Sequence, residues 1–472
     1  MKRLRGWDAV LLYSETPNVH MHTLKLAIID LAGLGGARFG VEELRKVIHG
    51  RLYKLDPFRY ELIDIPFKFH HPMWRENAEV DLDYHVRSCR VDAPGGRRQL
   101  DEMVGKLAST PLDRSRPLWE MYLIEGLADG RIAVLGKIHH ALADGVASAN
   151  LLARGMDLQE GPQADRDSYA TDPAPTRGEL VRSAFADHFR QIRRVPSVMR
   201  YTAQGVRRVR ESQHKLSPEL TRPFTPPPTF MNHMLDETRR FATATVALAD
   251  VKATAKHLGV TINDMVLSMS AGALRELLLR YDGHADHPLL ASVPVSFDFS
   301  PDRISGNYFT GVLVGLPVEI EDPLERVRAA HESAAAGKES NTLLGPELVS
   351  QWSAYFPPAP AEAMFRWLSA KDGQNKVMNL PISNVPGPRE RARVGGALVT
   401  GLYSVGPLTA GSGLNITVWS YVDQLNISVL ADGKTLEDPH ELTDAMVEAL
   451  VEIRRAAGLS EQLTEVDTAL AP

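Results

Sequence analysis

The sequence predicts an α/β protein of two domains, each a mixed β-sheet with flanking helices. With 472 residues, the chain is longer than one hydrophobic core usually organises. Segments with strand and helix patterns alternate in both halves. Between the halves, the composition shifts to Asp, Gln, Pro, Gly and Ser, which is typical of a linker. We therefore expect domains at 1–160 and 236–472, joined by a linker and crossover helix at 161–235.

The first half begins with an apolar run at 23–29, which predicts a strand, and then has apolar residues at helical spacing over 41–48. Long gaps separate its strands, which favours a largely mixed sheet. The other elements expected here are strands at 84–91, 119–124 and 132–138 and a helix at 97–109.

The middle segment carries a basic, amphipathic helical pattern. Pro196 should kink or break this helix. Either the helix is a crossover that packs its apolar stripe on a domain, or it rests on an anionic lipid surface. Four prolines at 223–228 then predict an extended stretch. The apolar positions are Phe185, Phe189, Ile192, Met199, Thr202, Val206 and Val209, among Arg182, Arg190, Arg193, Arg194, Arg200, Arg207, Arg208 and Arg210.

The second half again combines strand and helix patterns, as expected for a pseudo-duplicated fold. Its patterns predict helices at 250–257, 262–281, 324–335 and 439–457. They predict strands at 289–295, 312–317, 377–383, 414–420 and 426–430.

Composition excludes several classes of protein. The net charge of -6 argues against a nucleic-acid partner, since phosphate binding relies on clustered Lys and Arg. The single cysteine, Cys89, cannot form an internal disulfide and suits a reducing compartment. No apolar run is long enough to span a membrane. We therefore expect a cytoplasmic protein.

The segment His139-His140-Ala-Leu-Ala-Asp144-Gly145 follows an apolar strand and precedes a helical run. Adjacent histidines on an extended backbone point to opposite sides, so one can face a cleft while the other is structural. An imidazole can take a proton from an alcohol near neutral pH. Asp144 could hold the turn or pair with a cation, and Gly145 permits a tight bend or close packing.

Two other interpretations of the histidine pair are open from these residues alone. Both histidines could be satisfied structural groups near a turn. A zinc site is the other possibility, although no third nitrogen or sulfur ligand stands at motif spacing. We expect no metal.

The segment resembles the HHxxxDG signature of CoA-dependent acyltransferases, and other strings match the wax ester synthase/diacylglycerol acyltransferase family in order. The resemblance covers nearly the whole chain. The matching strings are Pro117-Leu118-Trp119, Asn263-Asp264, Trp7-Asp8-Ala9, Ser292 to Ser296, Gly306-Asn307, Ser383-Asn384 with the Pro-Gly-Pro turn that follows, and Leu414 to Tyr421.

The resemblance implies two CAT-like domains with a tunnel between them and the His140 segment at its centre. It implies acyl-CoA as co-substrate, with no permanently bound cofactor, and diacylglycerol or a long-chain alcohol as acceptor. His140 would be the general base, Asp144 would fix the loop or the tautomer, and no acyl-enzyme would form, in agreement with the absence of a Gly-x-Ser-x-Gly elbow.

Several matching residues could contact substrate or serve the fold alone. Pro117, Leu118 and Trp119 could pack around a strand start. Asn263 could donate to the reacting carbonyl or cap the helix that starts at Asp264. Ser383 and Asn384 could approach the carbonyl or only form a turn. Of these, Asn263 is the first expectation for the oxyanion donor.

The sequence also departs from the family. Asp298 stands where many members have an arginine, and Thr23 follows Met21-His22 where valine is more usual. These differences leave the acceptor preference open.

Two other functions share this pattern: a condensation domain acting on carrier-bound acyl groups, and a non-catalytic lipid-binding protein. A lipid product would bring the protein to the inner face of the cell membrane or to lipid droplets. The sequence does not determine the oligomeric state.

Overall fold

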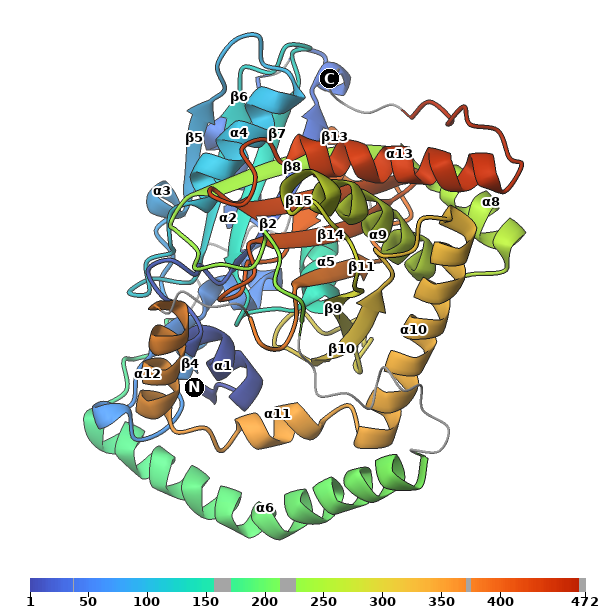
Figure 1. Cartoon of the computed structure of the whole chain (residues 1–472). Coiled ribbons are helices and arrows are strands. Elements are labelled where there is room, and N and C mark those ends of the chain that lie inside the picture. Colours follow the sequence, from blue (N-terminus) through green and yellow to red (C-terminus); the bar gives the residue numbers. More distant parts are fainter. Residues whose placement is uncertain (37, 157–170, 213–225, 371–374, 467–472) are drawn as a thin grey trace.

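A computed structural model describes residues 1–36, 38–156, 171–212, 226–370 and 375–466 (Figure 1). Over these residues the chain forms two six-stranded sheets, a small three-stranded sheet and the helices that flank them. The expected mixed α/β class is confirmed. Most of the expected linker composition falls on residues outside the described ranges.

The first sheet has the strand order β12-β13-β2-β7-β6-β5. All its pairings are antiparallel except that of β5 with β6. The strands are β2 (His22–Asp30), β5 (Val86–Arg90), β6 (Trp119–Glu125), β7 (Ile132–His139), β12 (Arg393–Val394) and β13 (Ala397–Val405).

The second sheet has the order β10-β9-β11-β14-β15-β8. Its strand β11 runs parallel to both neighbours, so this sheet is also mixed. The strands are β8 (Arg239–Ala247), β9 (Leu289–Ser296), β10 (Phe309–Leu316), β11 (Leu380–Val385), β14 (Leu414–Tyr421) and β15 (Gln424–Asp432).

The two halves of the chain interlock through β13. This strand follows β11 and β12 in the sequence, yet it pairs with β2 in the first sheet, from Leu398↔Asp30 to Val405↔Leu24, with a register shift between Val399 and Gly401. The expected boundary near 236 therefore does not separate the sheets cleanly, since β12 and β13 come from the second half. Tertiary pairing decides this placement, because an apolar strand is compatible with either sheet.

Helices cover both sheets. Helices α2 (Val41–His49), α4 (Arg97–Ala108) and α5 (Gly145–Gly155) belong to the first half. In the second half, α9 (Ile262–Tyr281) packs between α10 (Pro323–Leu344) and α13 (His440–Ala456), and α8 (Leu248–Leu258) precedes it. The strand expected at 84–91 is shorter than predicted, because residues before Val86 belong to the short helix α3 (Leu82–His85), which Asp81 caps.

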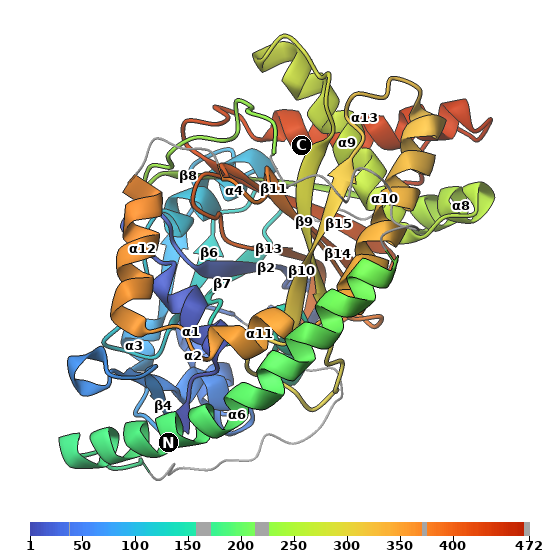
Figure 2. The same ribbon diagram turned by 60° about the horizontal axis from the view of Figure 1, so that its bottom comes forward.

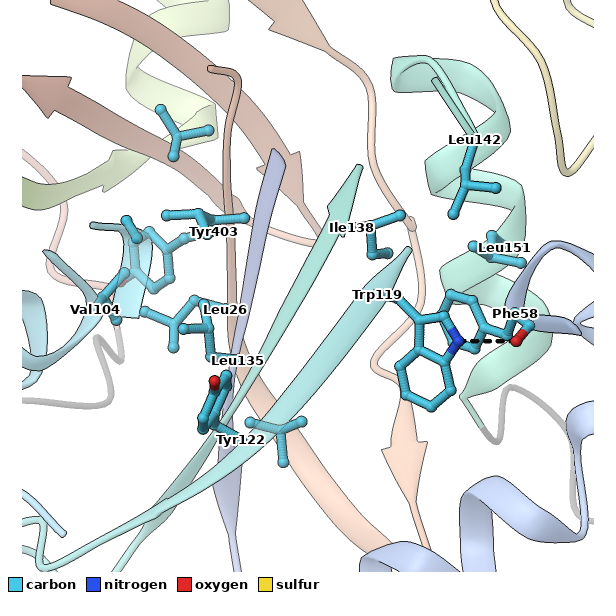
Figure 3. Close-up of a cluster of buried hydrophobic side chains, with 14 of the residues drawn as sticks. Leu26, Phe58, Val104, Trp119, Tyr122, Leu135, Ile138, Leu142, Leu151 and Tyr403 are labelled. Carbon is cyan, nitrogen blue, oxygen red and sulfur yellow. Dashed lines mark hydrogen bonds between the residues drawn. The ribbon is translucent and has the colours of Figure 1, made fainter. Parts of the chain in front are cut away.

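Side chains of the first sheet alternate between two packed layers (Figure 3). Leu26 and Leu135 lie on one side with Val104 of α4, whereas Ile138 and Trp119 lie on the other with Leu151 of α5. Both faces are therefore covered. The His139–Gly145 loop starts where β7 leaves this core.

A separate group of helices lies beneath the sheets in Figure 1. It consists of α1 (Gly6–Tyr13), α6 (Arg177–Ser212), α11 (Leu348–Ser353) and α12 (Pro358–Ala370), next to the small sheet of β1 (Lys2–Arg3), β4 (Met73–Arg75) and β3 (Glu61–Ile63). Helix α6 continues through Pro196, and its axis bends (Figure 1). Within the described ranges, no helix is both long and apolar enough to cross a bilayer.

Candidate active site

His139 and His140 leave the end of β7 in opposite directions. The N–H of His140 donates to Met21 O at 2.8 Å, which continues the pairing with the segment before β2. His139 is fully buried, its Nδ1 accepts from the N–H of Ala141, and its Nε2 lies 3.5 Å from Glu15 Oε2. His139 therefore holds the loop, while His140 is partly exposed.

The His140 ring is held by Asn307, which comes from the second half of the chain. Nδ1 of His140 lies 3.0 Å from Asn307 Oδ1. Asn307 is fully buried, and its Nδ2 donates to Asp8 Oδ1 and to the His140 carbonyl, each at 2.8 Å. Because two acceptors face the amide nitrogen, the amide oxygen must face the imidazole. Nδ1 then carries the hydrogen, and Nε2 keeps a free lone pair.

Asp8 anchors this arrangement from α1. Its Oδ1 also accepts the backbone N–H of Asn307 at 2.9 Å. Burial raises the pKa of Asp8 to about 6, although its hydrogen bonds to Asn307 oppose the rise. Burial also lowers the pKa of His140 below its ordinary 6.5, so the ring is a neutral base at pH 7.

Asp144 clamps the histidine loop to the loop that carries Asn307. One oxygen, Oδ1, caps α5 by accepting from Ala147 N at 2.9 Å. The other, Oδ2, accepts from Arg303 Nη1 and Tyr308 N, each at 2.9 Å. Asp144 thus fixes the loop, one of its two expected roles. The tautomer is instead held by Asn307.

Backbone bonds reinforce the clamp. The N–H of Gly306 donates to Leu142 O at 2.7 Å, and Ala143 forms a parallel bridge with Gly306. The positive charge beside Asp144 comes from Arg303, which also lies 3.5 Å from Asp298. The unusual Asp298 is therefore paired with this arginine.

Gly145 allows β11 of the second sheet to lie close to the start of α5. A Cβ at this position would lie 3.2 Å from a methyl group of Val385 on β11. Ser383 is two residues before Val385, so its side chain shares that face, whereas Asn384 points to the opposite side with buried Ile382. The structure brings Ser383, and not Asn384, to the side of β11 that faces this loop.

Trp119 and Leu118 serve the core. Trp119 is 1 % exposed, donates from Nε1 to Phe58 O at 2.8 Å and stacks on the Phe58 ring at 4.5 Å (Figure 3). The carbonyl of Leu118 accepts the N–H of His139. Of the two alternatives for Pro117-Leu118-Trp119, packing around the strand start is the one seen for Leu118 and Trp119, because the core encloses their side chains.

Asn263 and Asp264 lie in the first turn of α9. The N-cap is Thr261, not Asn263, and Asp264 Oδ2 accepts from the Thr261 hydroxyl at 2.8 Å. The same carboxylate lies 2.8 Å from Nδ1 of His331 on α10. Asp264 therefore completes the helix cap and links two helices.

This end of α9 lies away from His140. Ser333, two residues after His331, accepts the N–H of Gly315. Phe309 lies at the other end of β10, and its ring centroid is 5.7 Å from that of His140. Phe309 and Gly315 are about 20 Å apart along an extended strand. Helix capping places the first turn of α9 beside α10, which does not favour Asn263 as the oxyanion donor, and that expectation stays a prediction.

The residues that sequence reasoning missed are Asp8, Arg303 and Asn307. Trp7-Asp8-Ala9 and Gly306-Asn307 were recognisable strings, but their roles depend on contacts across 299 and 167 positions of the chain. No sequence motif pointed to Arg303. Only their convergence on one loop identifies them.

Sequence models of two domains match the chain. The wax ester synthase/diacylglycerol acyltransferase catalytic domain matches residues 4–266, and the C-terminal domain of the same family matches residues 305–454.

Similar proteins agree with these matches. A Mycobacterium tuberculosis protein with the provisional name diacylglycerol O-acyltransferase is 69 % identical over 471 residues, covering 100 % of both chains. The wax ester synthase/diacylglycerol acyltransferase structure from Marinobacter aquaeolei VT8 has a TM-score of 0.68 at 26 % identity and covers 97 % of this chain and 100 % of that one. The first condensation domain of the calcium-dependent antibiotic synthetase shares the fold, with a TM-score of 0.57 at 13 % identity over 98 % and 99 % of the chains.

Proposed function

Because the chain belongs to the wax ester synthase/diacylglycerol acyltransferase family and is an acyltransferase, we propose that it esterifies diacylglycerol with the acyl group of acyl-CoA. The observation that carries this proposal is the fixed amide of Asn307. It holds the proton of His140 on Nδ1 and leaves Nε2 as a base toward the partly exposed side of the ring.

In the proposed reaction, Nε2 of His140 takes the proton of the acceptor hydroxyl as the oxygen attacks the thioester carbonyl. The tetrahedral intermediate then collapses, the carbon–sulfur bond breaks, and His140 returns the proton to the CoA thiolate. The products are an ester and free CoA. The lone cysteine, Cys89, is no rival nucleophile, since burial raises its pKa to about 11.

We assign Ser383 as the candidate donor to the oxyanion. Its side chain shares the face of β11 that meets Gly145, and within the described part of the chain its hydroxyl has no hydrogen-bond partner. A free hydroxyl beside the loop can donate to an oxygen that becomes negative in the transition state. The tunnel and acyl-CoA binding that the family likeness implies belong to the same proposal.

Diacylglycerol is favoured over a fatty alcohol by the name of the relative at 69 % identity. Either acceptor is too apolar to be abundant in water, so we also propose that the enzyme works peripherally at a lipid surface.

The test is release of free thiol from palmitoyl-CoA with diacylglycerol, with hexadecanol and without acceptor. We expect release that depends on diacylglycerol and falls at least roughly 100-fold in His140→Ala. His284→Ala, an exposed histidine outside the site, is the matched control. Full turnover by folded His140→Ala would disprove the mechanism, and lipid uptake without thiol release would favour a binding protein.

A further inference from the structure

An apolar row runs along the exposed side of α6. Its members stand at positions i, i+4, i+7, i+14 and i+21, which fall on one side of a helix. Their exposed fractions run from 38 % for Val206 to 68 % for Ile192. Single exposed apolar residues are common, but a continuous row marks an interaction surface. The row is Phe185, Phe189, Ile192, Met199 and Val206.

A basic row accompanies it. Arg193, Arg200 and Arg207 are exposed, and each follows a member of the apolar row by one position. The helix contains nine arginines and three carboxylates, in a protein whose net charge is -6. Arg207 is paired with Glu211, while Arg193 lies 5.9 Å from the Phe189 ring. Positive charge is therefore concentrated on this helix.

The fold does not use these rows. Helix α6 packs through other positions, including Leu180, Ala184 and Val198, which are buried. Gln191 donates to Ala354 O at 2.8 Å, and Trp352 of α11 donates to Thr202 at 2.9 Å. The contacts that hold α6 thus leave both rows in solvent.

The loop at 66–69 extends the apolar surface. Phe67 is 99 % exposed with φ 60°, a left-handed backbone that is costly for a bulky residue. Phe69 lies 5.0 Å from the Phe185 ring, and Lys68 forms an ion pair with Glu362 of α12. An aromatic side chain that is fully exposed on a strained backbone does not stabilise the fold, which indicates that Phe67 has a binding partner.

Helices α11 and α12 complete one face. Figure 2 shows α6, α11 and α12 on the same side of the molecule, around α1. A groove of about 430 Å³ between α6 and α11 is lined by Met199, Val206, Trp352, Arg207 and Arg210, among others. Further exposed apolar side chains on the two short helices are Val349, Met364, Trp367 and Leu368.

We propose that these elements form a docking face for an anionic lipid bilayer, made of the two rows of α6, the 66–69 loop, α11 and α12. Phe67 and the apolar row enter the headgroup region, while Arg193, Arg200 and Arg207 contact lipid phosphates. The match of basic and apolar rows to an anionic, amphiphilic surface selects a bilayer over a protein partner. The inference deepens the proposed lipid acceptor but does not depend on turnover.

The docking face also connects to the active site. Helix α1 packs against α11 and α12, and α1 carries Asp8, whose carboxylate holds Asn307 and through it His140. A bilayer on this face would lie on the side of the molecule from which the catalytic base is anchored.

The test is co-sedimentation with phosphatidylcholine vesicles, with and without phosphatidylglycerol. We expect the full-length protein to bind only the anionic vesicles and to dissociate as salt rises. Arg193→Glu/Arg200→Glu/Arg207→Glu should weaken binding at least tenfold. Arg240→Glu/Lys252→Glu/Lys256→Glu, an equal change of charge on exposed residues of β8 and α8, should not. Phe67→Ser should weaken binding severalfold, unlike Leu279→Ser on α9.

Binding by His140→Ala should equal that of the wild type, which separates this inference from the catalytic proposal. Equal loss of binding in the two charge-reversed triple variants would overturn the docking face. Vesicle binding that is unchanged by the substitution of Phe67 and by that of the three arginines would also overturn it. A change of molecular mass in Phe67→Ser with unchanged vesicle binding would also overturn it, since a second copy of the chain would then be the occupant.

Discussion

Arg303 and Asp144 form a nearly buried ion pair, with Nη1 and Oδ2 2.9 Å apart, that joins segments 159 positions apart. Asp144 belongs to the loop of His140 and Arg303 to the loop of Asn307. The pair therefore fixes the position of His140, the proposed catalytic base, relative to the residue that orients its ring.

Arg303→Ala should lower the free energy of unfolding by about 3 kcal/mol, because it leaves the Asp144 carboxylate buried without its partner. Chemical denaturation measures this change. Asp144→Ala/Arg303→Ala should cost less than the sum of the single substitutions, and strictly additive losses would show that the two groups do not interact.

Asn307→Ala should reduce kcat roughly 100-fold, since the imidazole can then take either tautomer and loses its alignment. The KM for acyl-CoA should change little, because Asn307 is buried behind the ring. Steady-state kinetics measures kcat and KM separately. A rise in KM with unchanged kcat would instead assign Asn307 to substrate binding.

Asp8→Asn should stabilise the protein at neutral pH. The pKa of Asp8 rises from 3.8 to about 6 on folding, so ionisation costs about 3 kcal/mol in the folded state. Below about pH 4 both states hold the proton; between about 4 and 6 only the folded state does, and wild-type stability falls as pH rises. Asparagine can keep both bonds to Asn307 without this loss.

Melting temperature against pH tests this expectation. The advantage of Asp8→Asn should grow between pH 4 and 6 and then level off. An advantage that is the same at every pH would mean that the Asp8 carboxylate does not titrate as its burial requires.

The acid limb of kcat/KM against pH should have its midpoint below 6.5. Burial lowers the pKa of His140 from that value, so the base stays neutral as pH falls to 6.5 and is lost only when it protonates at lower pH. Profiles with two different acceptors should agree. A midpoint above 6.5 would show that the charged ring is stabilised in the free enzyme.

Ser383→Ala should lower kcat roughly 100-fold if its hydroxyl donates to the oxyanion. Asn384→Ala and Asn263→Ala are the matched controls, because the first points to the other face of β11 and the second lies beside α10. A larger loss in either control than in Ser383→Ala would move the donor there.

Local patterns predicted most elements. The span 262–281 coincides with α9, and 132–138 lies within β7 (Ile132–His139), because apolar periodicity over a long segment reports which face is buried. Helix α10 runs beyond its expected end at 335 to Leu344, where small and polar residues blur the apolar stripe.

The elements that were missed depend on partners. Helix α1 is only 8 residues long, and β13 is an apolar strand whose sheet cannot be read from its own residues. Asn263 shows the converse, since a matching string suggested a catalytic role that its turn of α9 does not support.

The sequence by itself determined the fold class, the family and the opposite orientations of the two histidines, because these follow from short-range periodicity and from contiguous residues. Only the tertiary structure decided which groups surround His140. Asp8, Arg303 and Asn307 act by donating or accepting hydrogen bonds over about 3 Å, and they lie at that distance because segments from both halves of the chain meet at the His140 loop.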